Sequence, residues 1–239
     1  MADMVTLTID GRKLTVPAGT TILEAAKDAN IYIPNLCSNE ELAPYGSCRL
    51  CMVEITHHGR SRLVAACTYE VADDLQVNTH TERVLKVRKL VIELLLARNS
   101  THPILLRIAN ELGVQATRFP IEQKGCILCG QCVRTCREVV GVSAIGFSGR
   151  GITRRVAAPF MDFPPDCIAC GSCVYICPVN FLPMREQNGV RTIIRFDFPM
   201  QQCKKCGKFF APKKQLQHFS KITGLPLEHF ETCVDCRKS

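Results

Sequence analysis

The chain has 239 residues, room for one large domain or two to three small ones, and 46% of them are hydrophobic, so a buried core is possible. The unusual count is 16 Cys. The first residues carry no export signal, and no apolar run is long enough to cross a membrane. We therefore expect no membrane span and a cytoplasmic location, where thiols stay reduced and clustered Cys bind metal rather than form disulfides.

The formal charge of +8 suggests a nucleic-acid partner, but this count treats every Cys as neutral. Sixteen metal-bound thiolates would add about sixteen negative charges, and the metal that they bind would return about eight positive ones. The excess of Lys and Arg then balances an anionic metal load. Since the chain has 6% aromatic residues and no Trp for base stacking, we expect no nucleic-acid binding.

The Cys fall into four groups of four, which predicts a modular α+β protein. The expected modules are a β-grasp [2Fe–2S] ferredoxin domain over residues 1–79, a helical connector over residues 80–115, a bacterial-type two-[4Fe–4S] ferredoxin domain over residues 116–185, and a C-terminal zinc-ribbon-like module over residues 186–239.

The first module has the pattern of a β-grasp domain. Residues 5–9 and 13–16 alternate around an Asp10-Gly11 hairpin turn. Thr21 and Glu24 form a capping-box pattern for a helix that ends near residue 29. Later strands are expected over residues 51–55 and 63–67. In the connector, apolar residues recur at helical spacing over 84–95 and 104–112, which predicts two helices with a break near residues 99–103.

The first Cys group follows the β-grasp pattern with the spacing C-x10-C-x2-C-x15-C. Plant-type ferredoxins use a shorter first gap and a distant fourth Cys for a [2Fe–2S] cluster. Gly46 and Ser47 precede the second Cys and suit a tight loop with amide donors. We expect a [2Fe–2S] cluster, with zinc as the alternative, on Cys37, Cys48, Cys51 and Cys67.

The second and third groups repeat C-x2-C-x2-C-x3-C, the pattern of bacterial two-cluster ferredoxins. The first three Cys of each run reach one cubane, and the fourth serves the other cluster. A hairpin is expected between the runs, near residues 144–157. The predicted [4Fe–4S] ligand sets are Cys126, Cys129, Cys132 and Cys177 for the first cluster, and Cys136, Cys167, Cys170 and Cys173 for the second. Structural zinc or buried thiols are the alternative.

The last group forms two C-x2-C knuckles separated by 26 residues, a spacing close to that of zinc ribbons. We expect one structural Zn²⁺ on Cys203, Cys206, Cys233 and Cys236. A rubredoxin-like iron or a third cubane is the alternative. His218 and His229 are weaker candidates, because four Cys already suffice.

Three segments together resemble a known family: PNLCSNEELAPYGSCRLCMVEI, GCILCGQCVRTCREVVGVSAIGF and DCIACGSCVYICP. They resemble the N-terminal region of the large iron–sulfur subunit of complex I. They are also similar to the small diaphorase-type iron–sulfur subunits of NAD-linked hydrogenases, formate dehydrogenases and electron-bifurcating enzymes. The resemblance covers about residues 1–185. It implies a hetero-oligomer in which this chain connects a flavin- and NAD(H)-binding subunit to a catalytic oxidoreductase subunit.

The connector departs from this family, which usually carries a His-x3-Cys-x2-Cys-x5-Cys cluster site there. Starting from His102, the thiolate positions here are Leu106, Ala109 and Gln115. We expect that this cluster is absent and that His102 is a surface or capping residue. The [2Fe–2S] cluster must then lie close to the cubanes or be bridged to them by a partner's cluster, and we expect the second arrangement.

The sequence contains no dinucleotide fingerprint, no P-loop and no Ser–His–acid grouping, so we expect no catalytic residues. The predicted function is a non-catalytic electron-transfer subunit of an NAD(P)-linked oxidoreductase. One alternative is a succinate-dehydrogenase-type iron–sulfur subunit, which predicts a shorter first Cys gap and an incomplete third motif. Another is a zinc-ribbon binding protein whose clusters are structural.

Overall fold

A computed structural model describes residues 3–161 and 163–237, and divides the chain into two compact units, Met1–Gly130 and Gln131–Ser239. Five positions of the predicted modules, residues 1–2, 162 and 238–239, lie outside the described residues. No helix in the described part of the chain is long and apolar enough to cross a membrane.

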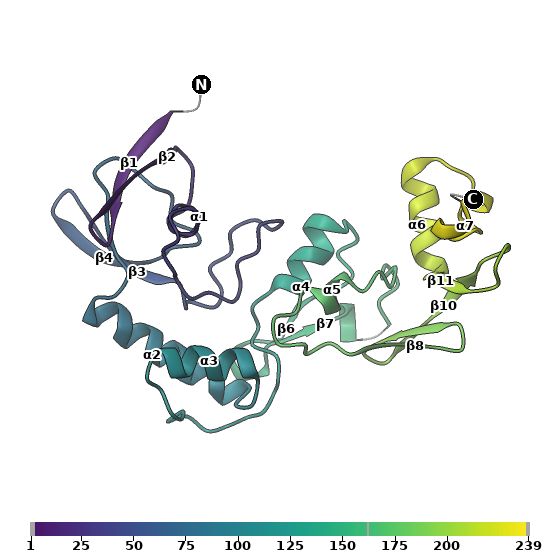
Figure 1. Ribbon diagram of the computed structural model, residues 1–239. Coiled ribbons are helices and arrows are strands. Elements are labelled where there is room, and N and C mark those ends of the chain that lie inside the picture. Colours follow the sequence, from purple (N-terminus) through teal and green to yellow (C-terminus); the bar gives the residue numbers. More distant parts are fainter. Residues whose placement is uncertain (1–2, 162, 238–239) are drawn as a thin grey trace. The chain divides into compact units, whose positions relative to one another are not determined.

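The first unit begins with a five-stranded sheet of order β2-β1-β5-β3-β4, drawn from purple to blue in Figure 1. Its strands are β1 Met4–Ile9, β2 Arg12–Pro17, β3 Met52–His57, β4 Arg60–Ala65 and β5 Gln76–Asn78. Strand β5 runs parallel to β1 and antiparallel to β3, and so joins two hairpins into one sheet. This order agrees with the predicted β-grasp arrangement.

Local sequence signals explain how this sheet and its helix begin. Asp10 and Gly11 both have positive φ, as a type I′ hairpin turn requires. Helix α1, Ile22–Asp28, starts with the predicted capping box, in which the Thr21 amide donates to Glu24 Oε2 at 2.7 Å. The helix buries Ile22 against a core that also contains two predicted cluster ligands, Cys51 and Cys67.

The connector forms the two predicted helices, α2 Glu82–Arg98 and α3 Pro103–Glu111. The His102 ring accepts the Ile104 amide through Nδ1 at 3.3 Å, so the expectation of a capping histidine is confirmed. Two of the apolar residues of α2, Leu90 and Leu94, are 41% and 46% exposed. The buried face of α2 instead carries Val84 and Ile92.

The second unit contains short helices and two small sheets. Its helices are α4 Gln131–Arg134, α5 Ser172–Tyr175, α6 Lys213–Thr223 and α7 Val234–Arg237, with a π-helical turn at Thr135–Val139 and 3₁₀ turns at Gly151–Thr153, Pro159–Met161 and Leu227–Phe230. The predicted hairpin is confirmed by β6 Gly146–Ser148 and β7 Arg155–Ala157.

A four-stranded antiparallel sheet of order β11-β10-β9-β8 was not predicted. Its strands are β8 Met184–Gln187, β9 Val190–Ile193, β10 Phe196–Gln202 and β11 Phe209–Pro212. Ile193 and Phe198 pack against Ala169 of the third Cys motif, while β10 leads directly to Cys203. The sheet therefore supports two of the Cys groups at once.

Candidate metal centres

The first Cys group lies at the edge of the β-grasp core. All four of its Cys are buried. The Cys48 amide donates to Cys37 Sγ at 3.4 Å, and the Cys37 thiol also interacts with Cys48 and Cys67. Cys51 interacts with Cys67, so the structure brings the four predicted ligands together.

Hydrogen bonds among these four thiols shift their pKa values in opposite directions. Interactions with the Cys48 and Cys67 thiols lower the pKa of Cys37 to about 2, because its thiolate receives hydrogen bonds. The thiol of Cys67 likewise lowers the pKa of Cys51 to about 7. Contact with Cys37 and Cys51 raises the pKa of Cys67. Four adjacent thiols cannot all ionise unless positive charge lies between them, and two iron ions would supply it.

The loop before Cys48 also contacts the second Cys group. Gly46 has a φ of +67°, and an added Cβ would meet the Thr68 methyl at 3.1 Å, so this position favours glycine. The Ser47 hydroxyl donates to the Leu128 carbonyl at 3.0 Å. Leu128 lies between Cys126 and Cys129, so one hydrogen bond joins the two Cys-bearing loops.

The ligands predicted for the first cubane are divided between the two compact units. Cys126 and Cys129 belong to the first unit, and Cys132 and Cys177 to the second. Within its own unit, Cys126 Sγ accepts the Leu128 amide at 3.4 Å, and Cys177 Sγ accepts the Phe181 amide at 3.3 Å. Amide donors to sulfur suit a cluster-bound thiolate, and the grouping of these four Cys stays a prediction from the motif.

The second cubane set lies wholly within the second unit. Burial raises the pKa of Cys173 to about 12, and the charges of Cys170, Cys167 and Cys136 add to that shift. Burial also raises the pKa of Cys136, whose charged neighbour is Cys170. The Ala144 amide donates to Cys136 Sγ at 3.2 Å. Cys136 therefore lies near the Cys of the other motif, as crossed ligation requires.

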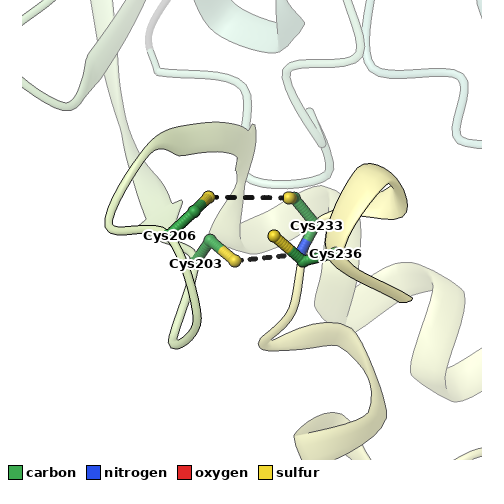
Figure 2. Close-up of side chains that lie close together, drawn as sticks. All are labelled: Cys203, Cys206, Cys233 and Cys236. Carbon is green, nitrogen blue, oxygen red and sulfur yellow. Dashed lines mark hydrogen bonds between the residues drawn. The ribbon is translucent and has the colours of Figure 1, made fainter. Parts of the chain in front are cut away.

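The four C-terminal Cys form the most compact set. Their sulfurs lie within 4.8 Å of one another, and among the described residues this is the one such group of three or more Cys, His, Asp or Glu. Figure 2 shows Cys203 and Cys206 facing Cys233 and Cys236. The Cys206 and Cys233 sulfurs are 3.8 Å apart. A tetrahedral zinc with Zn–S bonds of ~2.3 Å has S–S edges of ~3.8 Å.

Amide donors and neighbouring thiols shift the pKa values of Cys203 and Cys236 in opposite directions. Amide hydrogen bonds from Cys233 and Cys206 lower the pKa of Cys203 to about 6. Interactions with the thiols of Cys233 and Cys206 raise the pKa of Cys236 to about 12. Neither His218 nor His229 belongs to the compact group.

A basic side chain donates to a backbone carbonyl within or beside each of the four Cys groups, a feature that the Cys spacings did not predict. The overall excess of Lys and Arg, and the lysines beside Cys203 and Cys206, hinted at it. The bonds are Arg88 Nε to Met52 O at 3.0 Å, Arg98 Nε to Cys126 O at 2.9 Å, Arg191 Nη1 to Ala169 O at 2.7 Å, and Lys205 Nζ to Cys236 O at 2.8 Å.

Comparisons with known proteins identify the class. A model of the 2Fe-2S iron-sulfur cluster binding domain matches residues 2–82, and a model of the 4Fe-4S dicluster domain matches residues 166–208. With the mixed α+β fold, these matches define an iron–sulfur protein with ferredoxin-type 2Fe–2S and 4Fe–4S domains.

A chain in the crystal structure of NAD⁺-reducing [NiFe]-hydrogenase in the H2-reduced state is 33% identical, with a TM-score of 0.57 over 64% of this chain and 74% of that chain. The HndD subunit of the NADP-reducing hydrogenase of Solidesulfovibrio fructosivorans is 34% identical over 77% of this chain and 36% of its own length. A subunit of an NADH-quinone oxidoreductase of Rhizobium meliloti is 34% identical over 75% of this chain and 24% of its own length.

The chain belongs to the family of iron–sulfur subunits that these hydrogenases and NADH-quinone oxidoreductases contain. It spans only 24% to 36% of the length of these two curated relatives.

Proposed function

We propose that this chain is a non-catalytic electron-transfer subunit of a cytoplasmic NAD(P)-linked oxidoreductase. It relays electrons between a flavin- and NAD(H)-binding subunit and a catalytic subunit such as a hydrogenase or formate dehydrogenase. The observation that carries this proposal is that Cys136 lies near Cys167, Cys170 and Cys173 of the other motif, because crossed motifs serve to hold two clusters side by side.

In this proposal Cys37, Cys48, Cys51 and Cys67 hold one [2Fe–2S] cluster, and the two crossed sets of Cys hold two [4Fe–4S] clusters. When bound, each cluster supplies one-electron transfer without bond rearrangement. The protein contributes amide donors to the sulfurs and the burial of the thiolates, which tune the reduction potentials.

For the route between the clusters, we propose an alternative to the bridged route that we expected from sequence. The connector positions Leu106, Ala109 and Gln115 offer no thiolate. The bond from Ser47 to the Leu128 carbonyl supports a direct route from the [2Fe–2S] loop to the first cubane loop, with no partner cluster between them. We therefore propose the direct route in place of the bridged one.

The C-terminal set holds one structural Zn²⁺ in this proposal. The dicluster match extends to residue 208 and so includes Cys203 and Cys206, which would favour a cubane. A cubane, however, keeps its thiolates apart with iron and sulfide between them, whereas these sulfurs lie within 4.8 Å. The short distances between the four sulfurs favour a single ion. They outweigh the match to the dicluster model, because they concern the ligand atoms themselves.

The experiment is anaerobic purification of the chain with its partners, followed by metal analysis and addition of NADH or NADPH. We expect about ten Fe and about one Zn per chain. A flavin subunit should co-purify with the chain, and NAD(P)H should reduce the clusters only when that flavin subunit is present. Two results together would favour the binding-protein alternative. Neither NAD(P)H nor dithionite would reduce the clusters, and the full chain would bind nucleic acid in a salt-dependent way.

A further inference from the structure

Helix α2 places one arginine inside the β-grasp domain. Arg88 is 1% exposed, among the largest fully buried side chains of the described residues. Its Nε donates to the Met52 carbonyl at 3.0 Å. Met52 follows Cys51 directly, so the guanidinium is anchored one residue from a proposed [2Fe–2S] ligand.

One nitrogen of this guanidinium, Nη2, has no hydrogen-bond partner among the residues that the structure describes. Arg88 Nη2 is buried and makes no hydrogen bond, and none of the described carboxylates lies within 4.0 Å to form a salt bridge with Arg88. Asp10 is occupied elsewhere, since its Oδ1 accepts the Thr79 amide at 2.7 Å and its Oδ2 accepts the Thr79 hydroxyl at 2.5 Å.

A buried charge without a counterion is costly, and arginine cannot escape the cost by losing its proton under ordinary conditions. Burial lowers the pKa of Arg88, while negative charge on Cys51, Asp10 and Tyr32 raises it. Cys51 has the largest of these three effects, and as a cluster ligand it would carry part of the charge of a bound cluster. The missing counterion is therefore supplied when the cluster is present.

We infer that Arg88 is the internal counterion of the [2Fe–2S] cluster and raises its reduction potential. The inference rests on the proposed assignment of that cluster to Cys37, Cys48, Cys51 and Cys67. Reduction adds one electron, which dithionite supplies in a titration, and breaks no bond. A fixed positive charge nearby stabilises the extra negative charge, so the reduced form gains more than the oxidised form.

The test is a potentiometric titration of the full chain, anaerobic, followed by EPR of the reduced [2Fe–2S] signal. The variants are Arg88→Gln, Arg88→Met and Arg88→Lys. The matched control is Arg83→Gln on the same helix, because the Arg83 side chain is 59% exposed and pairs with Glu54, whose side chain is 12% exposed. All chains are loaded in the same way, and the two [4Fe–4S] signals serve as internal references.

At the wild-type midpoint potential, we expect Arg88→Gln and Arg88→Met to lower the ratio of reduced to oxidised [2Fe–2S] cluster about tenfold. For a one-electron couple, this change equals a lowering of the midpoint potential by about 59 mV. In Arg88→Lys the midpoint potential should stay close to the wild-type value, and in Arg83→Gln it should be unchanged. If Gln and Met prevent loading while Lys permits it, the requirement for charge also supports the inference.

An unchanged midpoint in Arg88→Gln or Arg88→Met would overturn the role of Arg88 alone. Failure of all three Arg88 variants to load would do the same, because it would show a packing role that even a retained charge does not satisfy. A wild-type chain without any [2Fe–2S] signal would instead overturn the proposed cluster site, and this inference with it.

Discussion

Removing one thiolate from each C-terminal knuckle, in the double variant Cys206→Ser/Cys236→Ser, should release the metal and loosen the C-terminal module. Two remaining Cys cannot complete a four-coordinate site. Cys206 is exposed and Cys236 is only partly buried, so the substitutions themselves disturb little packing. Any large effect must then come from the lost metal.

The size of the effect follows from the chain between the knuckles. A metal that joins Cys206 to Cys233 closes a loop with 26 residues between its ends. If the metal acts as a cross-link, closing a loop of this length removes about 3.5 kcal/mol of unfolded-chain entropy at 25 °C. Local opening should therefore become about 300-fold more frequent in the double variant.

Hydrogen exchange of the full, anaerobically prepared chain measures this opening. The informative amides are Cys203, which donates to the Lys208 carbonyl at 2.9 Å, and Lys204, which donates to the Glu231 carbonyl at 3.0 Å. Both should lose protection in the double variant and after chelation of zinc. Amides of the sheet β1–β5 should keep theirs.

The control variants are His218→Ala and His229→Ala, which should retain both the zinc and the protection. Unchanged exchange after proven loss of zinc would refute the cross-link reasoning. Loss of zinc from either histidine variant would show that the ligand set is wrong.

Crossed ligation predicts that Cys136→Ser perturbs the EPR signal of the Cys167 cluster, whereas Cys177→Ser perturbs the other cubane; the reverse pattern would show that each run holds its own cluster. Thr21→Ala should destabilise the β-grasp domain by about 1 kcal/mol because it removes the capping box, and an unchanged urea midpoint would contradict this. Ser47→Ala should slow electron transfer between the [2Fe–2S] cluster and the first cubane without changing their midpoints, as followed by rapid-freeze EPR after a reducing pulse. An unaltered rate would count against the direct route.

Signals within a few residues allowed the N-terminal fold to be predicted. The Asp10-Gly11 turn and the capping box of Thr21 and Glu24 are both confirmed, because each depends only on residues close in sequence. The short Cys spacings also depend on residues close in sequence, and for that reason the Cys groups could be recognised from the sequence. The sheet β8–β11 was missed, although Asn188-Gly189 is a hairpin dipeptide and both residues have positive φ.

Arg88 could not have been found from the sequence. It lies between Lys86 and Lys89 on a helix with charged and apolar residues on several faces, so its position looks like a surface one. Its role depends on the packing of α2 against β3, which brings together residues 36 positions apart. The same limit applies to Ser47 and Leu128, which are 81 positions apart.

The most direct test of electron transfer is the number of electrons that the fully loaded chain accepts in an anaerobic dithionite titration. Three clusters predict three reversible one-electron steps per chain, one with a [2Fe–2S] EPR signature and two with [4Fe–4S] signatures. Clusters that stay in one oxidation state throughout the titration would contradict the account.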